Sequence, residues 1–99
     1  MTNFQINNDD LASLMIYSFR YVLGRMSYAP SDWVGMYKYI YPKLDERNKE
    51  LLYTRVKEEL EQAFRIEEIN PKSLGMDCDR QLWHDFYDYL LTLKEKKDA

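Results

Sequence analysis

The stretch "DERNKELLYTRVKEELEQAFR", residues 45–65, carries the most regular helical pattern of the chain. Its apolar side chains repeat at intervals of four, four and three residues, at Leu52, Val56, Leu60 and Ala63. Glutamate, lysine and arginine occupy the other faces, and this spacing is typical of a helix with one buried face. We therefore predict a helix over residues 45–66 that begins at Asp45.

A second amphipathic helix is predicted earlier in the chain, over residues 9–23. Its apolar side chains fall in one broad arc of the helical wheel, formed by Leu11, Leu14, Met15, Ile16, Phe19, Val22 and Leu23. Opposite that arc lie Ser13, Tyr17 and Arg20. The helix is expected to start near Asn8, because Asn or Asp at that place accepts hydrogen bonds from the free amides of the first turn.

Two shorter patterns predict the remaining helices. Residues 31–41 form a helix that begins at Ser31, with Pro30 just outside, and stops before Pro42, because proline disfavours helical geometry at the preceding residue. The segment "NPKSLG", residues 70–75, is typical of a turn that Leu74 and Met76 anchor to the core. A last helix over residues 78–94, starting at Asp77 or Asp79, carries an apolar stripe of Trp83, Phe86, Leu90 and Leu93.

These patterns predict one all-α domain over residues 1–99, a single-domain four-helix bundle-like fold with short connections. Residues 1–8 are expected to be a polar lead whose Phe4 and Ile6 fold back onto the domain. Trp33 and Trp83 are expected to be structural, since large aromatic rings supply much of the buried area of a small core. A chain of 99 residues is long enough to fold alone, but with little margin.

Acidic residues are concentrated in the second half of the chain. Residues 1–45 carry four acidic and four basic side chains, whereas residues 46–99 carry thirteen and ten, which accounts for the net charge of −3. A candidate acidic face is formed by Glu58, Glu59, Glu61, Glu67 and Glu68. Such a window is usually a solvated helix face, and less often imitates nucleic acid or meets a basic partner.

The residues that catalysis or metal binding needs are present without an organising motif. His84 is the only histidine and Cys78 the only cysteine, and no phosphate loop or nucleophile motif is found. The interpretation that we favour is structural: Cys78 is a small buried side chain and His84 lies on the flank of a helix. The alternative is a catalytic triad formed by Cys78, His84 and an aspartate. We predict no catalytic residue, no metal site and no cofactor.

The cellular compartment follows from three features of the sequence. A lone cysteine leaves no internal disulfide and suits a reducing cytoplasm. The first ten residues lack the basic and apolar regions of a signal peptide. No apolar run approaches the ~18–20 residues needed to span a bilayer. We therefore expect a cytoplasmic protein without a membrane partner.

Gly24 and Arg25 follow the first predicted helix and have two interpretations. Gly24 either ends the helix in the left-handed conformation or lies within it and allows another backbone to approach closely. If the helix continued, Arg25 would project among apolar positions, which favours an end or bend at Gly24. Arg25 then has a structural role, bonding the last carbonyls or a carboxylate from another helix.

The tyrosines supply the candidate interface. Tyr37, Tyr39 and Tyr41 cannot all face inward on one short helix, because their spacing throws Tyr39 away from the other two. Arg20 lies on the predicted polar face, where we expect it to stack on Tyr17 or Tyr21. Tyrosine and arginine are over-represented in protein-interface hot spots, and aromatics beside arginines also hold single-stranded nucleic acid. The candidate interface residues are Tyr17, Arg20, Tyr21, Tyr28 and Tyr39.

The segment "FRYVLGRMSY", residues 19–28, resembles a pattern in small uncharacterised proteins of Gram-positive bacteria and their phages. That pattern reads as an aromatic residue followed by R-Y-x-L-G-R-x-[TS]-Y, and it is matched by Phe19, Arg20, Tyr21, Leu23, Gly24, Arg25, Ser27 and Tyr28. The stripe around Trp83 is similar to those proteins as well. The resemblance implies a phage or mobile-element context and assigns no catalytic residue.

Together these features favour a non-enzymatic interaction protein that binds and inhibits a host protein, for example as a counter-defence or anti-CRISPR inhibitor. A small nucleic-acid-binding transcriptional regulator is the first alternative, disfavoured by the acidic charge. A structural homo-oligomer held together by surplus aromatic side chains is the second.

Overall fold

A computed structural model describes residues 7–23, 30–75 and 77–98 of the chain. These residues form four α-helices: α1 (Asn8–Val22), α2 (Pro30–Ile40), α3 (Glu46–Ile69) and α4 (Asp77–Asp98). A short 3₁₀ helix, η1 (Tyr41–Lys43), connects α2 to α3. The part of the chain that the structure describes contains no strand, which confirms the prediction of an all-α, four-helix bundle-like fold.

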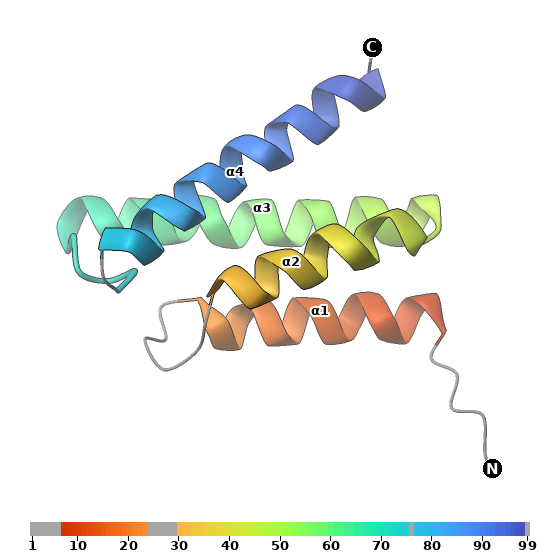
Figure 1. The fold of residues 1–99 in the computed structure, drawn as a ribbon, viewed down its shortest axis with the longest axis horizontal. Helices are drawn as coiled ribbons and strands as arrows, with labels where there is room; N and C mark the ends of the chain where they lie inside the picture. The colour runs from red at the N-terminus through yellow and green to blue at the C-terminus, as the bar shows by residue number, and fades with distance from the viewer. Residues whose placement is uncertain (1–6, 24–29, 76, 99) are drawn as a thin grey trace.

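The helices alternate in direction. α1 and α3 run side by side in the same direction, while α2 and α4 run the opposite way (Figure 1). The closest packing joins α1 to α3, and α4 packs against both α2 and α3. α4 crosses α3 obliquely, so that its C-terminal end diverges from the other helices (Figure 1). Each helix therefore buries one face against two neighbours and leaves another face outside.

The helix boundaries correct the sequence predictions at several ends. α1 is capped by Asn7, whose side chain accepts from the amide of Asp10 at 2.8 Å, so it begins one residue earlier than predicted. Pro30 belongs to α2, since a proline suits the first position of a helix, where no amide donor is needed. α3 continues to Ile69 and α4 to Asp98, because no glycine or proline interrupts either segment.

The core is built around aromatic rings from three helices. Trp33 of α2 and Trp83 of α4 are both buried, with 2% and 1% exposure, as the sequence predicted. Between them lies Phe19 of α1, whose ring centroid is 4.7 Å from that of Trp33. Leu14 corrects the predicted buried arc, because it is 57% exposed. The buried face of α1 is centred on Ala12, Met15 and Phe19, which places Leu14 at the margin that no helix covers.

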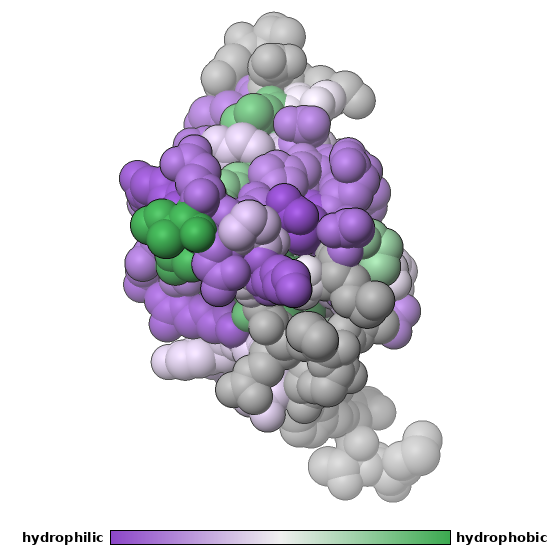
Figure 2. Space-filling model, turned by 90° about the vertical axis from the view of Figure 1, so that its left-hand side faces the viewer, coloured by the Kyte–Doolittle hydropathy of each residue, from purple (hydrophilic) through white to green (hydrophobic). Residues whose placement is uncertain are grey.

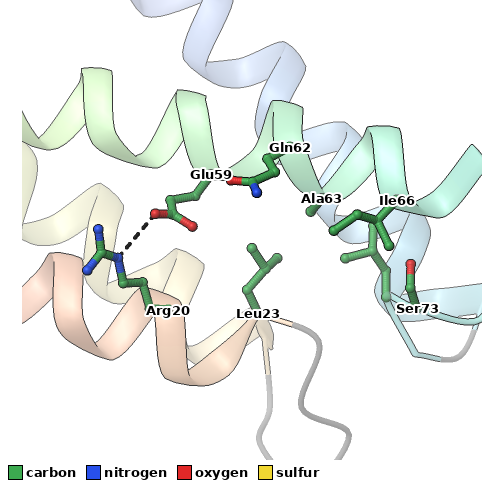
Figure 3. Close-up of a pocket in the computed structure, with 8 residues that line it drawn as sticks. Arg20, Leu23, Glu59, Gln62, Ala63, Ile66 and Ser73 are labelled. Atoms are coloured by element: carbon green, nitrogen blue, oxygen red, sulfur yellow. Dashed lines mark hydrogen bonds and ion pairs between the residues drawn. The ribbon is translucent and has the colours of Figure 1, made fainter.

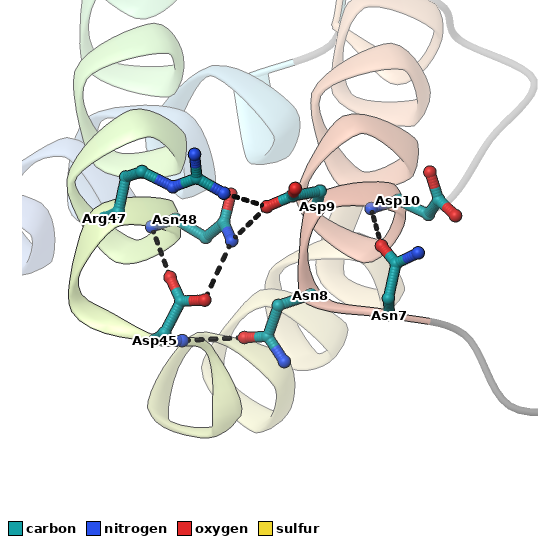
Figure 4. A network of polar contacts seen from close by, with 7 residues as sticks. All are labelled: Asn7, Asn8, Asp9, Asp10, Asp45, Arg47 and Asn48. Carbon is teal, nitrogen blue, oxygen red and sulfur yellow. Dashed lines mark hydrogen bonds and ion pairs between the residues drawn. The ribbon is translucent and has the colours of Figure 1, made fainter.

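The N-terminal ends of α1 and α3 are tied together by polar side chains (Figure 4). Asp45 caps α3 by accepting from the amide of Asn48 at 2.9 Å, and Asn8 accepts from the amide of Asp45 at 2.7 Å. Asn48 is buried, and its side-chain amide donates to Asp9, which pairs with Arg47. Hydrogen bonds from Asn48 and Arg47 hold the pKa of Asp9 below its ordinary range. This network fixes α1 parallel to α3.

Several predicted features lie outside the described residues. They are the polar lead with Phe4 and Ile6, the anchor Met76, and the group of Gly24, Arg25 and Tyr28. The described neighbour of Gly24 is Leu23, which is extended, with φ −64° and ψ 121°, and whose amide bonds the carbonyl of Phe19. α1 therefore ends at Val22, before Gly24 is reached.

Two tyrosine-to-phenylalanine changes are expected to alter stability in opposite directions. The Tyr37 hydroxyl is buried and has no hydrogen-bond partner among the described residues, so burial raises the pKa of Tyr37 far above its ordinary range. Tyr37→Phe removes this unsatisfied group and is expected to raise the free energy of unfolding by about 1 kcal/mol. Denaturant unfolding of the purified variant measures the change.

The matched control is Tyr87→Phe. The Tyr87 hydroxyl donates to Glu61 at 2.7 Å, so the same chemical change removes a charge-assisted hydrogen bond there. It is expected to lower the free energy of unfolding by about 1 kcal/mol. Equal effects of the two substitutions would contradict the assignment of a satisfied and an unsatisfied hydroxyl.

Candidate binding site

A cleft of about 300 Å³ lies between the end of α1, the C-terminal half of α3 and the turn that precedes α4 (Figure 3). Its apolar lining is supplied by Leu23, Ala63, Ile66 and Leu74. Leu74 is buried and belongs to the core, whereas Ile66 is half exposed at the side of the cleft. The cleft is therefore a hollow in the outer edge of the core, and aliphatic side chains supply half of its lining residues.

Polar groups surround this apolar lining. Arg20 of α1 bonds through Nε to a Glu59 carboxylate oxygen of α3 at a distance of 3.1 Å. The second Glu59 oxygen and the Gln62 amide point toward the space above Leu23 (Figure 3). Ser73 also lines the cleft, and its hydroxyl is buried and has no hydrogen-bond partner in the described part of the chain. The site thus combines an ion pair, whose charges cancel, with one hydroxyl that has no partner among the described residues.

Local sequence explains how the turn brings Ser73 to the cleft. The Ser73 amide donates to the carbonyl of Asn70 at 3.0 Å, and the amide of Gly75 donates to the carbonyl of Lys72 at 3.1 Å. Gly75 has φ 92°, a conformation that glycine adopts without the strain of a side chain. The predicted turn over residues 70–75 is confirmed, and it reverses the chain closely enough to bury Leu74.

The end of α3 beside the cleft exposes further apolar surface. Figure 2 views the molecule from this side, and apolar side chains protrude there from a largely hydrophilic surface. The exposed apolar residues of this segment are Ile66, with 49% exposure, and Ile69, with 87%. Ile69 lies nearly one turn beyond Ile66 on the helix, so the apolar surface extends from the cleft to the end of α3.

The predicted interface tyrosines lie on the outer faces of α1 and α2. Tyr17, Tyr21 and Tyr39 are 69%, 51% and 68% exposed, and Tyr39 indeed points away from the buried Tyr37. Leu14 joins Tyr17 and Tyr21 on one stripe of α1, at positions i, i+3 and i+7. Arg20 of α1 lies next to this stripe in the sequence and also lines the cleft.

The structure gives Arg20 a partner that the sequence did not predict. We expected its guanidinium to stack on Tyr17 or Tyr21, but it bonds Glu59, which lies 39 residues away in the sequence. The bond therefore joins Arg20, a residue of the candidate interface, to Glu59, a residue of the candidate acidic face. Arg20 and Glu59 keep 45% and 29% of their side-chain surface exposed, so the pair lies at the rim of the cleft.

The five glutamates of the candidate acidic face do not lie on one solvated side of α3. Glu58 and Glu68 are exposed, Glu59 bonds Arg20, and Glu61 bonds both Lys57 and Tyr87. Hydrogen bonds from Tyr87 and Lys57 lower the pKa of Glu61 below its ordinary value. Glu67 corrects the prediction most strongly, because it is 8% exposed and faces α4. Helical spacing distributes these five residues over several sides of α3.

Glu67 is the centre of a small ionic cluster between α3 and α4. Arg80 donates to one carboxylate oxygen at 2.7 Å, and His84 Nε2 lies 2.8 Å from the other. The His84 ring stacks on Phe64 at a centroid distance of 4.1 Å. Burial by itself raises the pKa of Glu67, but the bonds from Arg80 and His84 outweigh it and hold that pKa below its ordinary value. The cluster stabilises the crossing of the two helices.

The structure separates the two residues of the alternative catalytic triad. His84 faces α3, whereas Cys78 lines a groove between α2 and α4 with Val34 and Phe86. Cys78 is exposed, which corrects the expectation of a buried thiol. Within the described residues, no group of three or more His, Cys, Asp or Glu side chains is arranged to hold a metal ion.

Among the described helices, none is both long enough and apolar enough to cross a membrane. A comparison of the chain with models of protein families, with curated proteins and with solved structures gives no match. The fold and the cleft define the chain at the level of a small all-α domain with a surface cleft.

Sequence reasoning singled out Arg20 and Glu59 for the surface and assigned Leu23 and Leu74 to the core, but it did not predict that they meet in a cleft. Ala63 was assigned only to the apolar stripe of its helix, while Gln62, Ile66 and Ser73 were not singled out. One available signal was Ile69, an isoleucine outside the stripe that begins at Leu52 and directly before a turn. An aliphatic side chain outside the apolar stripe of its helix is not expected to pack into the core, so Ile69 indicates apolar surface near the end of this helix.

Proposed function

We propose that this chain is a non-enzymatic binding protein that holds and inhibits a protein of a bacterial host. The observation that carries the proposal is the cleft beside Arg20 and Glu59, with exposed aliphatic side chains at one side and the tyrosine stripe of α1 at the other. Apolar surface rimmed by polar groups marks interaction sites, and tyrosine, arginine and an aliphatic pocket are typical of hot spots. The resemblance of residues 19–28 to phage proteins favours a host protein as the partner.

The charge distribution supports a protein partner over nucleic acid. Six basic side chains of the described residues lie beside carboxylates: Arg20, Arg47, Lys49, Lys57, Arg80 and Lys94. Such pairing neutralises the positive charge that phosphate contacts require. A net charge of −3 also disfavours binding to nucleic acid, because the phosphates carry negative charge.

The proposal is tested by affinity capture from a lysate of a Gram-positive host, with and without nuclease treatment. We expect a host protein to be retained after nuclease and lost with the double variant Tyr17→Ala and Arg20→Ala. The matched control is Gln81→Ala with Asp88→Ala, at exposed positions of α4 away from the cleft. Capture that requires nucleic acid would instead support the regulator, and a mass in solution that rises with concentration would support the homo-oligomer.

A further inference from the structure

We infer that the cleft between α1, α3 and the turn before α4 accepts one aliphatic side chain of leucine size together with the peptide group next to it. The inference rests on the proposed function only in attributing this side chain to the partner protein. The cleft itself is defined by described residues, and its recognition chemistry can be tested without the partner.

The size and lining of the cleft select an aliphatic group. A volume of about 300 Å³ is at the lower limit of sites for small ligands, so it suits one side chain rather than a larger molecule. Leu23, Ala63, Ile66 and Leu74 offer dispersion contacts and no charge. The short side chain of Ala63 leaves the space open on α3. An aliphatic side chain placed there removes apolar surface of both molecules from water.

The rim selects a neutral peptide group. Arg20 neutralises Glu59 and orients its carboxylate, so an ionic ligand group would meet both a like and an opposite charge there. The second Glu59 oxygen accepts hydrogen bonds, and the Gln62 amide both donates and accepts (Figure 3). A peptide group has one N–H donor and one carbonyl acceptor, so its N–H suits the Glu59 oxygen and its carbonyl suits the Gln62 amide. Arg20 acts here as a positioning residue.

Ser73 provides the independent observation that points to a ligand. Ser73 lines the cleft, and its buried hydroxyl has no hydrogen-bond partner among the described residues, although buried polar atoms in proteins are normally paired. We infer that the Ser73 side chain rotates about its Cα–Cβ bond when a ligand is seated on the aliphatic lining, so that the hydroxyl donates to a carbonyl oxygen of that ligand. An amino-acid residue within a peptide has a peptide group on each side of the Cα that carries its side chain, so it offers polar groups to both Glu59 with Gln62 and Ser73.

The test uses N-acetyl-leucine amide, which carries one aliphatic side chain between two peptide groups. We expect saturable shifts of the methyl resonances of Ala63 and Leu74 in the full chain, with Kd on the order of a few millimolar for so small a ligand. N-acetyl-glycine amide, without a side chain, and N-acetyl-lysine amide, with a charge, are expected to bind at least tenfold more weakly. Equal shifts with the glycine and leucine compounds would overturn the inference.

Two variants examine the two halves of the site. Ala63→Phe places a ring in the cleft and is expected to abolish the shift of Leu74, with helical content checked by circular dichroism. Ser73→Ala removes one small polar atom and is expected to weaken binding about threefold to tenfold. Met36→Ser, at an exposed position of α2, is the control and is expected to change nothing. Unchanged affinity in both cleft variants would contradict the site.

Lysate capture with the same variants separates this inference from the proposed function. If wild type and Ala63→Phe retain the same host protein equally well, the partner does not use the cleft and the inference is wrong, although the binding function holds. If N-acetyl-leucine amide binds the cleft but no protein is retained, the cleft recognises its ligand as inferred and the proposed function fails.

Discussion

Trp33→Ala is expected to lower the free energy of unfolding by about 4 kcal/mol, the largest effect of any change considered. The indole is 2% exposed and lies at the meeting point of three helices. Its ring centroid is within 6.3 Å of the rings of Phe19, Tyr37, Phe86 and Trp83. Its Nε1 also donates to the Ser18 hydroxyl at 3.0 Å. Alanine removes all of these contacts and leaves a cavity.

A domain of this size has about 5–15 kcal/mol of stability in total, so the variant is expected to melt about 20 °C lower than the wild type. Thermal and denaturant unfolding followed by far-UV circular dichroism give the two values. Trp33→Phe is the control, because it keeps an aromatic ring and loses the hydrogen bond to Ser18, and about half the effect is expected. A loss below 1 kcal/mol for Trp33→Ala would mean that the indole is not in the core.

Glu67→Gln is expected to lower the free energy of unfolding by about 2 kcal/mol at pH 7. The substitution keeps the shape of the side chain but removes the charge that Arg80 and His84 contact at 2.7 and 2.8 Å. Loss of one member of a buried charged group leaves its partners incompletely compensated, and the partial exposure of Arg80 and His84 moderates the cost. Glu68→Gln, at the exposed neighbouring position, is the control and is expected to change stability by less than about 0.5 kcal/mol.

The contribution of Glu67 to the free energy of unfolding is expected to decrease as the pH is lowered into the acidic range. Its folded-state pKa lies below the ordinary value of 4.5, so the carboxylate contributes fully above that value and loses its contribution as pH falls through the folded pKa. The difference in stability between wild type and Glu67→Gln should therefore be constant near neutral pH and shrink below about pH 4.5. Urea titrations at several pH values measure it, and a difference that grows on acidification would contradict the assignment.

Local patterns were sufficient for the helices and most of the core. Leu52, Val56 and Leu60 are fully buried, because a repeat of four residues keeps side chains on one face of a helix whatever it packs against. Phe19, Trp33, Trp83 and Phe86 were predicted in the same way and are buried. The exposed Tyr39 followed from geometry as well, since a side chain two residues from Tyr37 on a helix points elsewhere.

The errors occur where a second helix decides the environment. Leu14 belongs to the apolar arc of α1 but lies at the margin that no neighbouring helix covers. Glu67 belongs to an acidic window but meets Arg80 and His84 of α4, and these bonds offset its burial. Cys78 was expected to be buried as a small apolar side chain, and the groove that it lines is open. The sequence on either side of Leu14, Glu67 and Cys78 does not predict any of these three environments.

Local features of the sequence are sufficient to predict four helices with the two tryptophans in the core, because helical period, turn residues and large apolar side chains act locally. The position of the cleft and the pairing of the charges depend instead on how the helices pack. Arg20 and Glu59 are 39 residues apart, and Glu67 and Arg80 are 13 apart, so only the packing of α1 and α4 against α3 brings them within bonding distance. The cleft exists for the same reason, since its lining comes from two helices and a turn whose relative positions are set by the whole core.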